Sequence, residues 1–176
     1  MSADANFGVK SRAVTDGEMI LATVDVPVPP ERVFRALTTD EAETWWGSDD
    51  FYHVRDWKAD LRVGGHWSLS VHTPDGNIFP ASGEFLEIDS PGKIALTRRY
   101  DWDNPRLGRR VTTVTYRMDP IPNGTHVTVR HEGFAGCRES AYEHETGWTH
   151  FLDWLQAYLE TGARTNLTRI FKGDRS

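Results

Sequence analysis

The sequence predicts an α+β domain in which a long C-terminal helix covers one face of a strongly bent antiparallel sheet of about six to seven strands. Two observations predict this fold class. From about residue 54 to residue 131, short runs of strand-forming residues alternate with turn residues, which is typical of an antiparallel meander. Apolar side chains then recur at helical spacing up to residue 160. A chain of 176 residues is long enough for one such domain with its own core.

The domain is expected to span residues 17–160, between two less regular ends. Residues 1–16 are polar and irregular, so we expect a flexible N-terminal lead-in. Residues 161–176 form a C-terminal tail with three large apolar residues, Leu167, Ile170 and Phe171. These side chains are expected to dock either on the body of the domain or on a second subunit, which would make the protein a homodimer.

The N-terminal part of the domain predicts one strand followed by two short helices. Residues 19–26 are rich in strand-forming side chains and are bounded by a cluster of prolines. Pro30 favours the first helical turn, because the N–H that proline lacks would be unsatisfied there, so a helix is expected over residues 31–37. Thr38 and Glu41 have capping-box spacing and predict the start of a second short helix.

Five turn signals divide the central segment into about six strands. They are Gly64-Gly65, Pro74-Asp75-Gly76-Asn77, Asp89-Ser90-Pro91-Gly92, Asn104-Pro105 and Pro122-Asn123-Gly124. The last helix is expected to begin at Ser140, which has capping-box spacing with Glu143, and to end at Glu160. Gly162 is placed for its C-terminal cap.

Composition excludes several classes of function. The formal net charge of −6 disfavours nucleic-acid binding, because a polyanion would be repelled. No run of apolar residues approaches the roughly 18 that a membrane-spanning helix needs, and no signal peptide is recognisable, so a cytoplasmic protein is expected. The single cysteine excludes an intramolecular disulfide and a zinc site of the CxxC kind.

The last helix carries the largest concentration of aromatic side chains. In GWTHFLDWLQAYLE, positions 148, 151, 152, 155, 158 and 159 recur at helical spacing and form one apolar stripe with two sides. The leucine side, Leu152, Leu155 and Leu159, is expected to fill the core. The aromatic side comprises Phe151, Trp154 and Tyr158. Large flat rings suit either ordinary packing or the wall of an apolar pocket, and the sequence leaves both interpretations open.

Strand alternation supplies candidates for the opposite wall. Side chains two residues apart share a face of a strand, so each apolar set is expected to point inward. In HWSLSVH this set contains Trp67 and Leu69, and in KIALTRRY it contains Leu96, Arg98 and Tyr100. The candidate cavity-lining residues are Trp45, Trp46, Trp67, Leu69, Leu96, Arg98, Tyr100, Tyr116, His131, Trp148, Phe151, Trp154 and Tyr158.

Two polar candidates have competing interpretations. An inward Arg98 would need a protein carboxylate or an acidic ligand group, because an isolated buried charge is costly. Alternatively the strand ends before Arg98, which then lies in solvent with the other arginines of the hairpin; the pattern favours this second interpretation. His131 shares a face with Val127 and Val129. It is expected either at the edge of the core, bonded to the backbone, or in the site.

Motifs for catalysis and cofactor binding are mostly missing. The sequence contains no GxSxG elbow, no phosphate-binding glycine loop and no HExxH. His144 and His150 lie six positions apart on the last helix, about 120° from each other, so they do not converge on a metal ion. We therefore expect no metal, no cofactor and no assigned catalytic residue, and the sequence favours a binding protein over an enzyme.

Five segments, in this order, resemble one known family. They are VPVPPERVFRALTTDEAETWW, DLRVGGHW, GEFLEIDSPGKIALT, NGTHVTVRHEGF and GWTHFLDWLQAYLE. Over roughly residues 18–160 the chain is similar to homologues of the activator of heat-shock-chaperone ATPase (AHSA-type), in the START-like (SRPBCC) superfamily. The resemblance implies a helix-grip fold, in which a curved sheet wraps around the C-terminal helix and leaves a cavity between them, with the Trp45-Trp46 pair at the cavity rim.

The resemblance implies three functions, because superfamily members differ in what they do. The leading hypothesis is binding of a small, mostly apolar or amphipathic molecule in the cavity. The second is a chaperone-associated interaction module that acts through its surface, although the chain lacks the additional N-terminal domain of the eukaryotic activators. The third is polyketide-cyclase-like or hydrolase-like chemistry, which would need Arg98 or His131 paired with Tyr100 or Tyr116 in the pocket.

Overall fold

The structure is a computed structural model that describes residues 11–163. Within this range it contains one sheet of nine strands and three helices. The strands are β1 (Arg12–Thr15), β2 (Met19–Val26), β3 (Gly47–Ser48), β4 (Tyr52–Ala59), β5 (His66–His72), β6 (Ile78–Asp89), β7 (Lys93–Tyr100), β8 (Thr112–Ile121) and β9 (Gly124–Glu132). The helices are α2 (Pro30–Thr38), α3 (Ala42–Trp45) and α4 (Arg138–Thr161).

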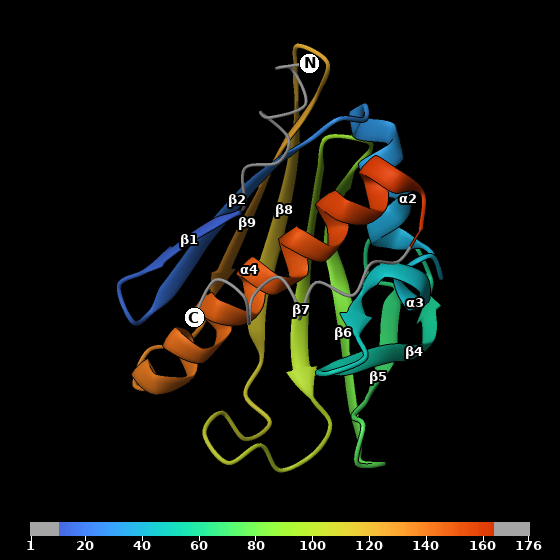
Figure 1. The fold of residues 1–176 in the computed structure, drawn as a ribbon. Helices are drawn as coiled ribbons and strands as arrows, with labels where there is room; N and C mark the ends of the chain where they lie inside the picture. The colour runs from blue at the N-terminus through green and yellow to red at the C-terminus, as the bar shows by residue number, and fades with distance from the viewer. Residues whose placement is uncertain (1–10, 164–176) are drawn as a thin grey trace, which may run out of the picture.

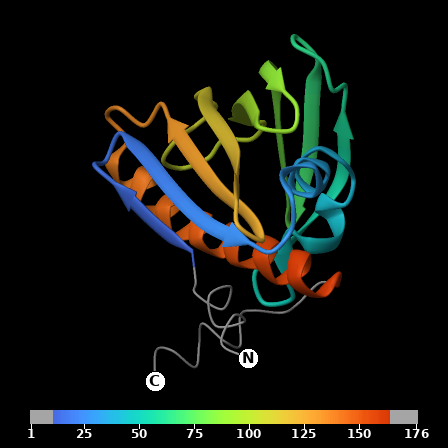
Figure 2. The same ribbon diagram turned by 90° about the horizontal axis from the view of Figure 1, so that it is seen from above.

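All neighbouring strands are antiparallel, in the order β1-β2-β9-β8-β7-β6-β5-β4-β3 (Figure 1). Strands β3 to β9 follow the chain as a meander, and β2 joins the meander by pairing with β9. The sheet bends strongly, and α4 runs along the side formed by β1 and β2 (Figure 2). This is the predicted α+β helix-grip arrangement, with more strands than the six to seven expected from the turn signals.

Two predictions about the N-terminal part were wrong. Residues 12–15 do not belong to an irregular lead-in: they form β1, whose residues pair with β2, for example Arg12 with Thr23. Thr38 does not begin the second helix. It is the last residue of α2, and its hydroxyl donates a hydrogen bond to the Phe34 carbonyl at 2.7 Å. Helix α3 therefore starts later than its capping-box spacing predicted, and Pro30 opens α2 as expected.

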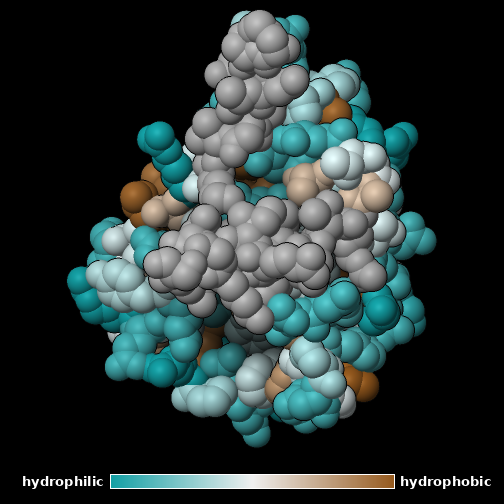
Figure 3. Space-filling model, in the orientation of Figure 1, coloured by the Kyte–Doolittle hydropathy of each residue, from teal (hydrophilic) through white to brown (hydrophobic). Residues whose placement is uncertain are grey.

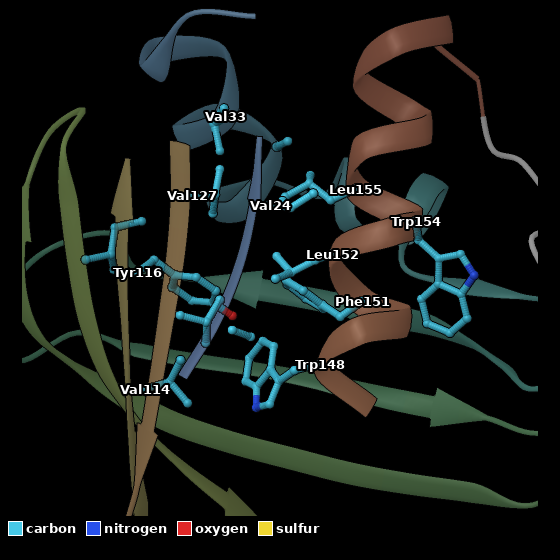
Figure 4. Packing of buried hydrophobic residues seen from close by; sticks show 14 of the residues in the cluster. Val24, Val33, Val114, Tyr116, Val127, Trp148, Phe151, Leu152, Trp154 and Leu155 are labelled. Carbon is cyan, nitrogen blue, oxygen red and sulfur yellow. The ribbon is translucent and has the colours of Figure 1, made fainter. Parts of the chain in front are cut away.

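Helix α4 places its apolar side chains on more than one surface. It starts two residues before the predicted Ser140, and its C-terminal cap is Gly162 with φ of 78°, as predicted. Leu152 and Leu155 are fully buried and point toward the sheet, while Trp154 projects from another side of the helix (Figure 4). One long helix thus contributes side chains from more than one of its sides to the same hydrophobic core.

A glycine brings two strands of the site close together. Trp67 on β5 donates a hydrogen bond from Nε1 to the Thr97 carbonyl of β7 at 2.9 Å, and its indole passes over Gly83 of the intervening strand β6. A Cβ atom at Gly83 would lie 1.8 Å from that carbonyl oxygen and 2.5 Å from Nε1 of Trp67. Only glycine leaves room for this bond, which fixes the Trp67 ring in the interior.

The described surface has scattered rather than clustered apolar residues. The face seen in Figure 3 is mostly hydrophilic outside the grey segments. The exposed large hydrophobic residues include Val14, Val63, Ile78 and Val111, which lie in separate elements or loops. Among residues 11–163, no helix is long and apolar enough to cross a membrane.

Candidate functional site

A pocket of about 210 Å³ lies between α4 and the inner surface of the sheet. Strand β7 and helix α4 contribute most of its wall, and the α3 end and β4 close one side. Its lining residues are Trp46, Tyr52, Arg98, Tyr100, Glu143, His144, Gly147, Trp148 and Phe151. A smaller hollow of about 20 Å³ shares Trp46 and Arg98 with it and is otherwise lined by Trp57, Trp67, Leu96, Val114 and Tyr116. Arg98 therefore stands between the two spaces.

Aromatic rings form most of the pocket wall and hold one another in place. The Phe151 ring makes edge-on contacts with Trp46, at 4.7 Å between centroids, and with Trp148, at 4.8 Å. Tyr116 stacks on the far side of Phe151 at 6.2 Å. Trp46 donates from Nε1 to the Tyr52 hydroxyl at 3.3 Å. Because each ring contacts others, the wall is rigid and largely apolar.

Arg98 is a half-buried cation without a hydrogen-bonded partner. Strand β7 continues to Tyr100, so the prediction that favoured a strand ending before Arg98 was wrong. Its guanidinium carbon lies 5.6 Å from the ring centroid of Tyr100 and 5.9 Å from that of Trp148. Within residues 11–163 the guanidinium makes no ion pair or hydrogen bond. The aromatic faces offer cation–π attraction but do not accept the directional N–H bonds that a guanidinium can form.

Tyr100 and His144 form a hydrogen-bonded pair at the pocket. The Ser140 carbonyl can only accept, so His144 donates to it from Nδ1 at 2.8 Å. Nε2 of His144 is then the acceptor for the Tyr100 hydroxyl at 2.7 Å. Burial, helped by the nearby positive charge of Arg98, lowers the pKa of His144 to about 4. His144 is therefore a neutral acceptor near pH 7.

His131 is fully buried behind the pocket wall and does not face the pocket. Trp148 donates from Nε1 to its Nδ1 at 3.0 Å, so Nε2 carries the proton and donates to Thr112 Oγ1 at 2.8 Å. Its partners are thus side chains, not the backbone that one interpretation expected. Burial, helped by the positive charge of Arg98, holds the pKa of His131 well below its usual value. His131 positions the Trp148 ring.

Two buried phenols of the wall also stay neutral. Burial raises the pKa of Tyr52 and of Tyr116 above the usual range, and the Arg98 charge opposes this only in part. The one acidic residue at the pocket is Glu143, which is exposed and lies 3.1 Å from Nε of Arg106. The interior of the site therefore combines neutral aromatic groups with one positive charge.

Eight of the thirteen predicted residues line these two spaces, and five do not. The eight are Trp46, Trp67, Leu96, Arg98, Tyr100, Tyr116, Trp148 and Phe151. Trp45 and Leu69 are buried in the core beside them. His131 lies behind the wall. Trp154 packs against Phe51 and Tyr52 on another side of α4, and Tyr158 donates to the Glu41 carboxylate at 2.8 Å.

The sequence interpretation missed Tyr52, Trp57, Val114, Glu143, His144 and Gly147. Three of these lie on α4, where a signal existed. His144 precedes Trp148 by four positions, and Gly147 precedes Phe151 by four, so both pairs share a helix face. The apolar stripe predicted from the sequence runs from Trp148 toward the C-terminus of α4. The pocket instead lies along the helix from Phe151 back toward its N-terminal half. Within the described part of the chain, no cluster of histidine, cysteine and carboxylate residues could hold a metal ion.

A bent antiparallel sheet closed by a long C-terminal helix, with a pocket between them, defines a helix-grip protein of the START-like class. A family model described as "Activator of Hsp90 ATPase homolog 1-like protein" matches residues 27–160. The match spans most of the sequence, and the chain belongs to this family.

Solved structures with the same fold come from several bacteria. A Rhodobacter sphaeroides protein has a TM-score of 0.74 at 16% identity, over 86% of this chain and 99% of that one. A Chromobacterium violaceum protein has a TM-score of 0.71 at 23% identity, over 81% and 97%. An Arthrobacter aurescens protein has a TM-score of 0.72 at 19% identity, over 84% and 90%. No curated protein sequence matches this chain.

Proposed function

We propose that the protein binds a small, mostly apolar molecule in the pocket between α4 and the sheet. The wall of aromatic side chains, above all Trp46, Trp148 and Phe151, carries this proposal. Burying roughly 200 Å² of apolar ligand surface would contribute about 5 kcal/mol, from which the cost of ordering the ligand is subtracted. Affinities in the micromolar to millimolar range are expected for simple aromatic compounds.

The polar groups of the pocket favour binding over acid–base catalysis. A general base works best when its pKa lies near the operating pH, whereas burial lowers the pKa of His144 to about 4. Its Nε2 already accepts the Tyr100 hydroxyl. His131, the other histidine considered for catalysis, does not line the pocket. Cyclase-like or hydrolase-like chemistry therefore has weaker support than recognition.

The test is calorimetric titration with 2-naphthamide, an uncharged two-ring probe, against wild type and a variant with a filled pocket. Gly147 lines the pocket, and a Cβ atom there would meet nothing within 4 Å, so Gly147→Leu adds an apolar side chain at the pocket wall without a clash at Cβ. The variant is expected to weaken binding at least tenfold while keeping the fold. Thr146→Leu, one residue away and exposed, is the matched control and should bind like wild type.

No saturable binding to wild type, or equal binding to wild type and Gly147→Leu, would contradict the proposal. Circular dichroism and thermal unfolding of both variants establish that each is folded before the titration is interpreted.

A chaperone-associated role at the surface is the second candidate. The family's description supports it, and so does a hollow on the outer face of the sheet that is lined by Lys93, Arg117 and Arg130. Lys93 and Arg130 pair with Glu87 and Glu132, and Arg117, without an ion pair within residues 11–163, is left to contact a partner. Such a surface would attract an acidic partner. Co-purification with a chaperone and a change in its ATPase rate would test this role. Arg117→Glu should abolish both effects, whereas Gly147→Leu should leave them intact.

A further inference from the structure

The pocket contains an arginine, Arg98, whose positive charge has no partner in the described part of the protein. Arg98 lies on the central strand β7, half-buried, and faces both the pocket and the smaller hollow. Even partial burial makes an unpaired charge costly, because the guanidinium loses part of its hydration. Within residues 11–163 the Arg98 guanidinium makes no hydrogen bond or ion pair, and its cation–π contacts are with Tyr100 and Trp148.

The protein groups around Arg98 do not supply the missing acceptor. Nε2 of His144 is occupied by the Tyr100 hydroxyl. Nδ1 of His131 accepts from Trp148, and its Nε2 faces Thr112. The Glu143 carboxylate is exposed and lies beside Arg106. The guanidinium donors of Arg98 therefore have no protein acceptor within residues 11–163, and Arg98 lines the space that a ligand would fill.

We propose that the bound molecule is a small aromatic or cyclic carboxylate whose anionic group binds the Arg98 guanidinium. This inference rests on the proposed function of the pocket. A guanidinium presents two parallel N–H donors that match the two oxygens of a carboxylate, and such charge-assisted bonds are about twice as strong as neutral ones.

Tyr52 is assigned as a second donor to the same carboxylate. Its hydroxyl oxygen accepts from Nε1 of Trp46, and its own proton has no acceptor within residues 11–163. Tyr52 and Arg98 line the same pocket. Burial raises the pKa of the Tyr52 phenol, which keeps the proton available for donation near pH 7.

The size of the pocket limits the rest of the molecule. Ligand sites commonly measure about 300–1,000 Å³, and this pocket measures about 210 Å³. A compound of one or two rings fits this space better than a long-chain fatty acid. Its ring would lie among Trp46, Trp148 and Phe151 while its carboxylate meets Arg98.

The test compares 2-naphthoate with 2-naphthamide, two probes of nearly the same shape that differ in charge. Wild type is expected to bind 2-naphthoate about 10- to 100-fold more tightly, as a charge-assisted pair predicts. Arg98→Met should remove that preference and leave 2-naphthamide binding within about twofold of wild type. Arg98→Lys should retain part of the preference for 2-naphthoate, because lysine keeps the positive charge but lacks the two parallel N–H donors of the guanidinium. The matched control is Arg99→Met: Arg99 is exposed on the same strand and pairs with Asp101.

The binding results distinguish failure of the carboxylate inference from failure of the proposed binding function. If wild type binds both probes equally, or if Arg98→Met keeps the preference for 2-naphthoate, the carboxylate inference is overturned while the proposed binding function stands. If neither probe binds, the proposed function itself fails. Should Arg98→Met fail to fold, Tyr52→Phe provides the second measurement: it is expected to weaken 2-naphthoate three- to tenfold and 2-naphthamide much less, and an unchanged 2-naphthoate affinity would contradict the assignment of Tyr52.

Discussion

Mild acid is expected to destabilise the protein because two of its histidines are buried in the neutral form. His144 and His131 each use one ring nitrogen as a hydrogen-bond acceptor, for the Tyr100 hydroxyl and for Trp148 Nε1 respectively. Protonation would remove both acceptors and would place a second positive charge near Arg98. The folded state therefore resists protonation, whereas the unfolded chain takes up protons with ordinary histidine pKa values.

The size of the effect follows from the difference in pKa between the two states. The pKa of His144 is about 4 in the folded state against 6.5 for an unperturbed histidine. At about 1.36 kcal/mol per pH unit, this difference corresponds to about 3 kcal/mol. The unfolded state binds more protons between these values, so the free energy of unfolding is highest above about pH 6.5 and falls as the pH drops toward 4. The lowered pKa of His131 acts in the same direction.

Urea unfolding followed by circular dichroism between pH 7 and pH 5 would measure this loss. The window lies above the usual pKa values of carboxyl groups, so histidines dominate it. We expect a slope near pH 5 steeper than about 1.4 kcal/mol per pH unit, which is the limit for one titrating group. His144→Gln should reduce the slope by about that amount, and the exposed His66→Gln should leave it unchanged. A free energy of unfolding that stays constant from pH 7 to pH 5 would refute the reasoning.

Three further predictions concern stability and can be checked by the same unfolding measurements at pH 7. Glu41→Gln should cost about 1–2 kcal/mol, because the carboxylate accepts the Tyr158 hydroxyl at 2.8 Å and pairs with two arginines while only 23% exposed; no loss would show that these bonds are exchanged for water without cost. Gly83→Ala should cost more than about 3 kcal/mol, because its Cβ would lie 1.8 Å from the Thr97 carbonyl oxygen, and a well-folded variant would contradict the close approach. Gly147→Ala should stabilise by about 0.5–1 kcal/mol, since it is helical and its Cβ would meet nothing within 4 Å; a destabilised variant would disprove the open space.

The features that the sequence predicted well depend on nearby residues. The periodicity of α4 and the positive φ of Gly162 follow from helix geometry and local capping. The features it missed depend on distant partners. Residues 12–15 form a strand because their backbone pairs with β2 at the edge of the sheet. The capping box at Thr38 failed because its hydroxyl bonds back to Phe34 within α2.

The contrast between local sequence signals and distant partners also explains which pocket residues could be predicted. Alternation placed Arg98 and Tyr100 on one face correctly. Pairing with distant strands determined that β7 continues that far: Arg98 lies opposite Thr112 of β8, and Tyr100 lies opposite Ala81 of β6. Helical spacing grouped Trp148 and Phe151 correctly, but it carries no information on where the pocket lies along the helix. Trp154 packs against Phe51. The periodicity of α4 could not reveal this contact, because Phe51 lies far away in the sequence.

The polar groups around the pocket differ in whether the protein satisfies their hydrogen bonds. This difference, more than the presence of an arginine in the pocket, supports a ligand-binding role for Arg98. His131 has both ring nitrogens bonded and so does His144, and each of these groups is neutral. Within residues 11–163 the half-buried Arg98 guanidinium, by contrast, makes no hydrogen bond or ion pair, and its cation–π contacts are with Tyr100 and Trp148. A partly buried charge loses hydration, and no ion pair or hydrogen bond within the described part of the protein offsets that cost. Stability alone therefore gives little reason for an arginine at this position, whereas recognition of an anionic ligand gives a direct one.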